Sequence, residues 1–390
     1  MPSDILGSIS PSAARLDESD IVAIMNLART MDDVVPLWVG EGDIPTPDFI
    51  VRAANEALKN GETFYTWQRG IPELRDALAR YHSEHFDRPH DTERYYVTGS
   101  GMQAIQLSLQ ALVQAGDEVV MLTPCWPNIH AAAQVCGAVP VHVELDFNTQ
   151  GWSLDVDRLA DAITPNTRVL FINSPANPSG WTADREILQS ILELARKHGL
   201  WIIADEVYSR FTYDVDRAPS FYDVMEEDDR ILFVNTFSKN WAMTGWRAGW
   251  ISAPPEVGQV LENLIQYSTS GVAPFIQRGA VAALEEGEPF FQMQKERAQR
   301  NRTVVCEGLQ STDKIQLAIP PAAFYLFFKI PGYADSKALA LRIIEEAGVG
   351  LAPGTGFYTG GTPYLRMCFL RDPLQIERAT QRLVDWVGTI

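Results

Sequence analysis

The sequence of 390 residues lacks the marks of a secreted, membrane-bound or nucleic-acid-binding protein. Its four cysteines show no CxxC spacing, its N-terminus has no charged-then-apolar signal, and it has no apolar run of the roughly 18 residues that span a bilayer. With 32 Lys and Arg against 50 Asp and Glu, its formal net charge of −18 opposes binding to nucleic acid or anionic lipid. We expect a cytoplasmic protein with reduced cysteines, no nucleic-acid partner and no membrane partner.

Histidine is also scarce, with six residues in the chain. His82 and His85 are spaced to lie on one face of a helix, but no carboxylate or cysteine completes a metal-binding set with them. We interpret the pair as part of a solvated helix surface and expect no metal site.

The composition is otherwise that of an ordinary globular protein, with 46% hydrophobic and 21% charged residues. Between residues 95 and 254, short apolar runs alternate with longer amphipathic ones, which is typical of an α/β sheet. The strands predicted from these runs are Tyr95–Thr98, Glu118–Thr123, Val139–Glu144, Arg168–Asn173, Leu200–Ala204, Ile231–Thr236 and Arg247–Ala253. Most are separated by enough residues for a helical crossover, so we expect a three-layer αβα sandwich with a mostly parallel, about seven-stranded sheet.

The last of these strands is expected to be antiparallel, because the stretch Lys239–Trp246 before it is too short for a crossover of about a dozen residues. Further along, strand-like AFYLFFKI and YLRMCFL with helical stretches around them predict a second, smaller α/β domain. A chain of this length exceeds the size at which one hydrophobic core usually stops growing, which also favours two domains. The expected division is 1–45 as an N-terminal segment packing with the small domain, 46–285 as the large domain and 286–390 as the small domain.

Polar residues follow several predicted strands directly, at the edge of a parallel sheet where ligands bind. The turn Gly99-Ser100-Gly101 lies between the first strand and a helix, so its backbone amides and the helix dipole suit an anion such as phosphate. Lys239 comes after the sixth strand with Arg247 nearby, and cationic charge together with partial desolvation would lower the pKa of its amine. Asp205 follows the fifth strand. We expect these residues to converge on one crevice.

The glycine turn also matches a dinucleotide-binding G-x-G-x-x-A pattern at Gly99, Gly101 and Ala104. That pattern needs an acidic residue at the end of the next strand to bind the ribose, but the next strand ends Leu122-Thr123-Pro124. An NAD-dependent dehydrogenase is therefore a remote alternative.

The segment FSKNWAMTGWRAGW around Lys239 resembles the pyridoxal-phosphate lysine signature of the class I and II aminotransferases, which share the fold-type I architecture of aspartate aminotransferase. Further motifs of this resemblance are VGEGDIPTP at 39–47, YTWQRGIPELR at 65–75, NSPANPSG at 173–180, DEVYSRF at 205–211, PPAAFY at 320–325, PGTGF at 353–357 and YLRMCF at 364–369. The resemblance implies an aminotransferase that moves an amino group from an L-amino acid to a 2-oxo acid by a ping-pong mechanism. Its cofactor would be pyridoxal 5′-phosphate, carried on Lys239 as a Schiff base.

The resemblance also implies roles around the cofactor. Asp205 would pair with the pyridine nitrogen, while Tyr208 and Asn177 would contact the phenolic oxygen. Trp126 would stack on the ring. The residues implied for the phosphate are Ser100, Gly101, Met102, Thr236, Ser238, Arg247 and, from a neighbouring subunit, Tyr65, which implies a homodimer with composite sites. Without the resemblance, Asp205 is equally well interpreted as the N-cap of a helix. Tyr208 is then one residue of an amphipathic helix, and Trp126 is a side chain that fills the core.

The substrate residues implied by the resemblance are Gly40, Trp126, Asn177 and Arg366. Arg366 would bind the α-carboxylate, because a planar guanidinium suits a bidentate grip. Met102 stands where some aspartate-using relatives carry Lys or Thr, and a thioether cannot bind a distal carboxylate. The resemblance also implies that Trp38 and Trp67 lie in loops at the substrate entrance, and together with Met102 they favour an apolar or aromatic donor. A β-lyase or another fold-type I reaction on the same lysine remains an alternative.

Overall fold

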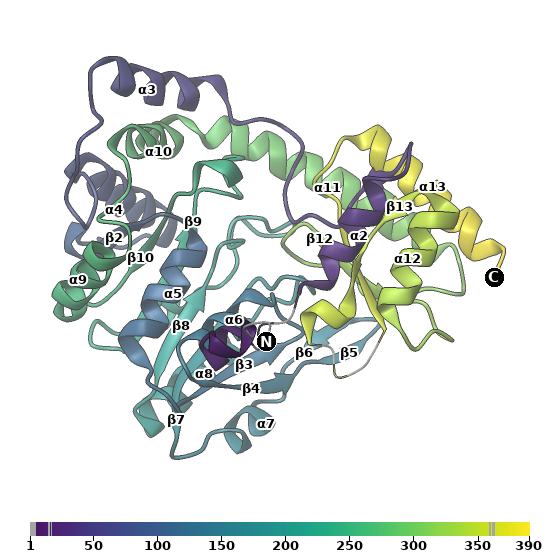
Figure 1. Cartoon of the computed structure of the whole chain (residues 1–390), viewed down its shortest axis with the longest axis horizontal. Helices are drawn as coiled ribbons and strands as arrows, with labels where there is room; N and C mark the ends of the chain where they lie inside the picture. Colours follow the sequence, from purple (N-terminus) through teal and green to yellow (C-terminus); the bar gives the residue numbers. More distant parts are fainter. Residues whose placement is uncertain (1–4, 15, 17, 359, 361–362) are drawn as a thin grey trace.

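A seven-stranded sheet forms the centre of the larger part of the molecule (Figure 1). The computed structural model describes residues 5–14, 16, 18–358, 360 and 363–390. In spatial order the strands are β2 (Tyr95–Thr98), β10 (Gly249–Ser252), β9 (Ile231–Thr236), β8 (Trp201–Asp205), β7 (Thr167–Asn173), β3 (Glu118–Thr123) and β4 (Val139–Glu144). The expected count is confirmed, and so is the antiparallel last strand, since β10 runs antiparallel to both β2 and β9 while the other pairs are parallel.

The sheet is covered on both faces because its central strands are apolar on both faces. Along β7, Leu170 and Ile172 pack against α8 (Arg185–His198), whereas Val169 and Phe171 face the opposite layer. That opposite layer consists of α5 (Gly101–Leu112), α6 (Asn128–Val135) and α9 (Gly258–Ser268). The αβα sandwich is therefore confirmed, with the alternation of buried side chains splitting the core into two parts.

A third group of helices covers the β2 edge of the sheet. It comprises α3 (Asp48–Lys59), α4 (Pro72–Phe86) and α10 (Pro274–Glu286), which pack around Trp241 and Trp250. The interpretation of His82 on α4 as a solvated residue is wrong, because its side chain is only 3% exposed. The indole Nε1 of Trp250 donates to His82 Nε2 at 3.2 Å, and burial holds the pKa of His82 well below its usual value. His85, one turn further on, is half-buried.

The smaller part of the chain is a four-stranded antiparallel sheet with helices against it. Its strands, in order, are β11 (Gln316–Leu317), β12 (Tyr325–Lys329), β15 (Tyr364–Cys368) and β14 (Ala352–Pro353). Its helices are α11 (Glu288–Gln310), α12 (Ser336–Ala347) and α13 (Pro373–Gly388). The two strands and the helices expected here are thus present.

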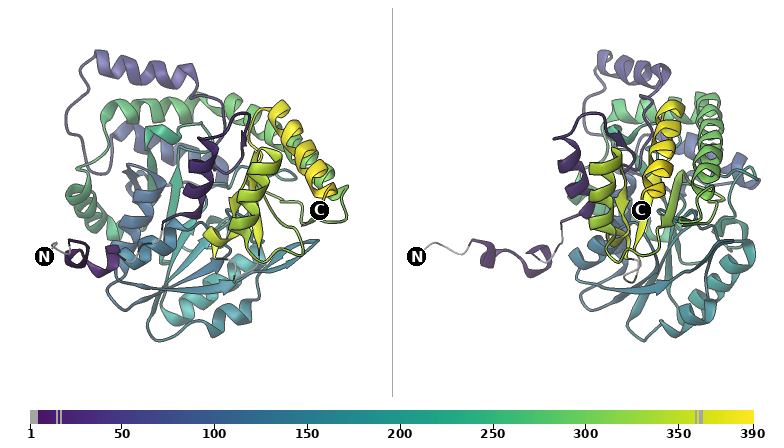
Figure 2. Two further views of the ribbon diagram at one scale, coloured as in Figure 1. Left: turned by 45° about the vertical axis from the view of Figure 1, so that its right-hand side comes forward. Right: turned by 90° about the vertical axis from the view of Figure 1, so that its right-hand side faces the viewer.

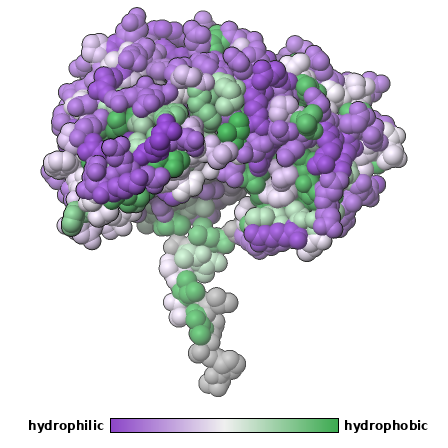
Figure 3. Space-filling view, turned by 90° about the horizontal axis from the view of Figure 1, so that it is seen from above, coloured by the Kyte–Doolittle hydropathy of each residue, from purple (hydrophilic) through white to green (hydrophobic). Residues whose placement is uncertain are grey.

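The N-terminal segment joins this smaller sheet layer. Strand β1 (Val35–Pro36) pairs in parallel with β13 (Val349–Gly350), and Ile24 of α2 (Asp20–Ala28) packs in the same core. The first described elements, η1 (Leu6–Ser8) and α1 (Pro11–Ala14), extend away from the body (Figures 2 and 3). The domain boundaries at residues 45 and 285 stay a prediction.

The remaining elements are short. They are α7 (Val156–Asp161), the hairpin β5 (Asp146–Asn148) and β6 (Gly151–Ser153), and the 3-10 turns η2 (Thr92–Arg94), η3 (Phe221–Asp223), η4 (Thr244–Trp246), η5 (Pro255–Val257) and η6 (Gly354–Phe357). Within the described ranges, no helix combines the length and the apolar character needed to cross a membrane. All four cysteines are free, and Cys136 alone among them is not fully buried.

Candidate active site

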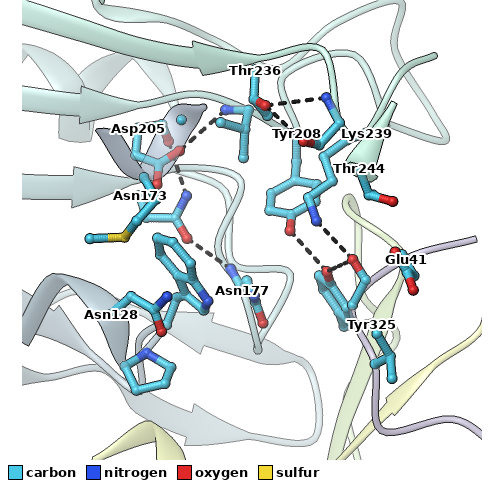
Figure 4. Close-up of a pocket in the computed structure, with 18 of the residues that line it drawn as sticks. Glu41, Asn128, Asn173, Asn177, Asp205, Tyr208, Thr236, Lys239, Thr244 and Tyr325 are labelled. Carbon is cyan, nitrogen blue, oxygen red and sulfur yellow. Dashed lines mark hydrogen bonds between the residues drawn. The ribbon is translucent and has the colours of Figure 1, made fainter. Parts of the chain in front are cut away.

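A cavity of about 510 Å³ lies where the carboxyl ends of the large sheet meet the N-terminal segment and the smaller sheet (Figure 4). The sequence-predicted residues on its wall are Gly40, Gly101, Met102, Trp126, Asn177, Asp205, Tyr208, Thr236, Ser238, Lys239, Arg247 and Arg366. The strand ends therefore converge as the parallel topology predicts.

Lys239 follows β9 by three residues and reaches across the cavity to the N-terminal segment. Its Nζ donates to the carbonyl oxygen of Gly40 at 2.8 Å (Figure 4). Desolvation lowers the pKa of the amine to about 8, and the charge of Arg366 acts in the same direction. An amine with this pKa is neutral in an appreciable fraction of molecules near neutral pH, so it can act as a nucleophile and as a base.

Asp205 is the last residue of β8, and its carboxyl group faces the cavity (Figure 4). Burial raises its pKa to about 7, although the backbone N–H of Val207 and the charge of Lys239 both favour the ionised form. The alternative roles of Asp205 as a helix N-cap and of Tyr208 as a helix residue are wrong, because a turn follows β8 and Tyr208 is buried. A buried carboxyl group with a raised pKa favours a cationic or N–H partner.

The start of α5 and the β9–β10 connection form a corner of the cavity whose donors could bind an anion, which we call the anion-binding corner. The first backbone N–H groups of a helix have no intrahelical acceptor, and Gly101 and Met102 hold these positions on the wall. A Cβ on Gly249 would lie 2.7 Å from the Gly101 nitrogen, so β10 approaches this corner without a side chain. The implied Ser100 does not line the cavity; its hydroxyl accepts from Gln103 N at 2.9 Å and caps the helix.

Hydroxyl groups and an arginine complete that corner. Thr236 Oγ1 lies 3.0 Å from Ser238 Oγ, and Arg247 Nη1 donates to Thr244 O at 2.6 Å. Donors and a fixed positive charge around a helix N-terminus are the arrangement that proteins use to bind phosphate.

Arg366 on β15 is the cation that the described part of the smaller sheet contributes to the cavity wall. Its Nη1 donates to Asn177 Oδ1 at 2.9 Å and its Nη2 donates to Trp38 O. The guanidinium lies over the rings of Tyr325 and Phe357, at 4.7 and 4.9 Å from their centroids, and its buried Nε has no partner among the described residues. The group is held in place and can still bind a carboxylate.

Sequence reasoning missed the wall contributed by α2 and β12. Ile21, Val22 and Met25 of α2 line the cavity, and so does Tyr325 at the start of β12. Tyr325 is the last residue of the motif PPAAFY, but a tyrosine at the start of an apolar strand is typical of a core residue and does not indicate a cavity. The spacing of the α2 residues indicates one helix face without indicating what that face covers.

Two aromatic residues that the sequence places near the site, Tyr65 and Trp67, do not line the cavity of the same chain. Tyr65 is 92% exposed and Trp67 is 63% exposed, and neither lines the wall. Trp38 does line it, but its indole is largely committed to packing on Gly350, where a Cβ would come within 2.2 Å of the ring.

The chain is similar to known proteins over most of its length. A family model described as Aminotransferase class I and II matches residues 32–383. The chain is 32% identical over 377 residues to "Probable aspartate aminotransferase" of Methanocaldococcus jannaschii, covering 95% of this chain and 97% of that one. It is 32% identical over 363 residues to "Probable N-acetyl-LL-diaminopimelate aminotransferase" of Bacillus subtilis, covering 93% and 91%. The solved Thermus thermophilus aspartate aminotransferase with maleate superposes with a TM-score of 0.90 at 32% identity, covering 97% and 99%.

Proposed function

This chain belongs to the aminotransferase class I and II family, and from that premise we propose which of its residues hold the cofactor and which amino acids serve as donors. The cofactor would be pyridoxal 5′-phosphate, attached to Lys239. The observation that carries this proposal is the presence of Lys239, Asp205 and the anion-binding corner around a single cavity.

The residues present fit this group at both ends. Asp205 would receive the protonated pyridine nitrogen, which removes the cost of an ionised carboxylate in a buried position. The amides of Gly101 and Met102, the hydroxyls of Thr236 and Ser238, and Arg247 would receive the phosphate. Trp126 and Val207 line the same cavity and supply apolar surface for a flat ring. Bound there, the cofactor supplies an aldehyde that captures amines and a ring that withdraws electrons from the substrate Cα.

With the cofactor bound, the chain's own residues would have separate roles in the reaction. Arg366 binds the α-carboxylate of the amino acid, and Asn177 and the Trp38 carbonyl keep the guanidinium oriented. Once released from the cofactor, Lys239 would remove the Cα proton as a general base and, as a general acid, would deliver it to the former aldehyde carbon of the cofactor. Tyr208 would donate a hydrogen bond to the phenolic oxygen of the cofactor. The same residues act on the 2-oxo acid in the second half of the ping-pong cycle.

We propose that the donor side chain is neutral and apolar. Its expected surroundings are Ile21, Val22 and Met25 of α2 together with Met102 and Ile105 of α5. The cationic side chains on the described wall are Lys239, Arg247 and Arg366, and each already has a role. None is left for a distal carboxylate, and Glu41 on the same wall adds a negative charge.

Steady-state rates over a panel of donors test this proposal. Leucine, methionine and phenylalanine should exceed aspartate in kcat/KM by at least about tenfold, which corresponds to roughly 1.4 kcal/mol. A preference for aspartate would contradict it. Assaying the 2-oxo acid and ammonia together separates transamination from β-elimination, because release of ammonia without an acceptor would indicate a lyase.

We also propose a homodimer in which Tyr65 reaches the phosphate corner of the partner. Phe64, Tyr65 and Trp67 are 80%, 92% and 63% exposed, and Tyr267 beside them is 87% exposed. A hydrogen bond between Gln68 and Gln266 joins these two segments. Such a group of exposed aromatic side chains favours contact with another protein surface.

Subunit mixing tests the shared site. Lys239→Ala chains keep Tyr65, and Tyr65→Ala chains keep Lys239, so a hybrid dimer contains one site with both residues intact. Activity should rise well above that of either parent after the two variants are unfolded, mixed and refolded. A monomer by analytical ultracentrifugation, or a mixture no more active than the average of its parents, would contradict the proposal.

A further inference from the structure

We propose that Tyr325 is a positioning residue of this site, which holds the hydroxyl of Tyr208 and links it to the Gly40 carbonyl that also accepts from Lys239. The inference rests on the proposed function, because it concerns how Tyr208 would act on the bound cofactor.

Three donors meet at this point in the cavity (Figure 4). The hydroxyls of Tyr208 and Tyr325 are 2.8 Å apart, the Tyr325 hydroxyl lies 3.3 Å from Gly40 O, and Lys239 Nζ lies 2.8 Å from the same oxygen. Both tyrosines are buried, and burial raises the pKa of each hydroxyl above its usual value. Both hydroxyls therefore stay protonated and can donate.

The position of Tyr325 is enforced from two sides. The guanidinium of Arg366 lies 4.7 Å from the centroid of its ring. A Cβ on Gly40 would lie only 2.6 Å from its hydroxyl oxygen, so the close approach of the two segments needs a glycine here. The hydroxyl thus connects the smaller sheet, the N-terminal segment and the turn after β8.

The Tyr325 hydroxyl has a single proton to donate, and two oxygens compete for it. The Tyr208 oxygen, at 2.8 Å, is a nearer acceptor for Tyr325 than the Gly40 oxygen at 3.3 Å, so Tyr325 donates to Tyr208 when Lys239 is attached to the cofactor. When Lys239 is free and donates to Gly40 O, this preference becomes stronger. The Tyr208 oxygen then accepts a hydrogen bond, which strengthens its own donation to the phenolic oxygen of the cofactor. Tyr325 in this way makes Tyr208 a better donor to the cofactor that Lys239 carries.

The experiment uses the cofactor-loaded protein and follows the change of its visible absorption with pH. Tyr208→Phe should raise the midpoint of that change, because the phenolate loses its donor. Tyr325→Phe should raise it by a smaller amount, about 0.5 pH unit, and should lower kcat several-fold with little change in KM. The double variant should titrate like Tyr208→Phe alone, since Tyr325 acts through Tyr208.

Tyr213→Phe is the matched control, because its buried hydroxyl donates to Ala323 O in the same core and does not line the cavity. It should leave the midpoint unchanged. An unchanged midpoint in Tyr325→Phe, or shifts that add in the double variant, would overturn the proposal. A wild-type protein without any visible band would instead reject the proposed function.

Discussion

The cavity has two walls of different chemical character. The wall formed by the strand ends of the large sheet carries Asp205, Thr236, Ser238 and Lys239, which are polar groups on a rigid support. The facing wall, formed by α2 and the smaller sheet, is mainly apolar, and Arg366 is its cation. The difference indicates a division of labour in which the sheet edge performs the chemistry and the facing wall selects and orients the substrate.

Asp205→Asn should have the largest effect on catalysis, because an amide cannot keep a pyridine nitrogen protonated. We expect kcat to fall by about 10³-fold, or roughly 4 kcal/mol, with a small change in KM. Single-turnover kinetics with a neutral donor would measure it. A near-normal kcat in this variant would show that Asp205, at the edge of the large sheet, does not take part in the chemical step.

The same substitution should stabilise the cofactor-free protein at alkaline pH. The pKa of Asp205 is raised from 3.8 to about 7 in the folded state, so folding becomes less favourable as the pH rises through this interval. Asparagine avoids that penalty and should increase the free energy of unfolding at pH 8 by up to about 4 kcal/mol, with no gain near pH 4. Urea unfolding of the wild type and the variant at both pH values would show the difference. Equal free energies of unfolding of the two proteins at pH 8 would contradict the cost of burying an ionised Asp205.

On the facing wall, Arg366→Lys should weaken binding of the α-carboxylate, because lysine cannot form two parallel hydrogen bonds. We expect kcat/KM to fall by about 10²-fold for every donor, mainly through KM. Arg210→Lys is a matched control, since Arg210 forms a bidentate ion pair with Glu288 outside the cavity. A uniform loss in both variants would show that Arg366 acts through stability alone.

Of these substitutions, Met102→Lys should have the smallest effect on catalysis. It should also reduce the difference in chemical character between the two walls of the cavity. A lysine at the start of α5 would add a cation to the donor pocket, and the ratio of kcat/KM for aspartate to that for leucine should rise about tenfold. Met102→Leu should leave the ratio unchanged. No rise with lysine would mean that the donor side chain does not reach α5.

The two walls also differ in how far they could be predicted from the sequence. The seven strands of the large sheet lie within two residues of their predicted bounds, and its central strands form continuous apolar runs because they are buried on both faces. Residues that follow parallel strands meet at one edge of the sheet, so Asp205 and Lys239 could be placed together. Leu200 and Arg247, expected within strands, lie just outside them.

The facing wall depends on packing between segments far apart in the sequence. The Tyr208 and Tyr325 hydroxyls meet although these residues are 117 positions apart, and no local pattern indicates such a contact. The burial of His82 was missed for the same reason, because only the fold shows that Trp250 covers that face of α4. Tyr65 is a different case, since its proposed target lies in a second copy of the chain.

The most direct test of the central claim is to reduce the cofactor-loaded protein with borohydride and to map the labelled peptide by mass spectrometry. The account predicts a pyridoxyl group on Lys239 in the sequence FSKNWAMTGWR, and no label in Lys239→Ala. Label on a different lysine, or no label in a protein that binds the cofactor, would contradict the assignment of Lys239.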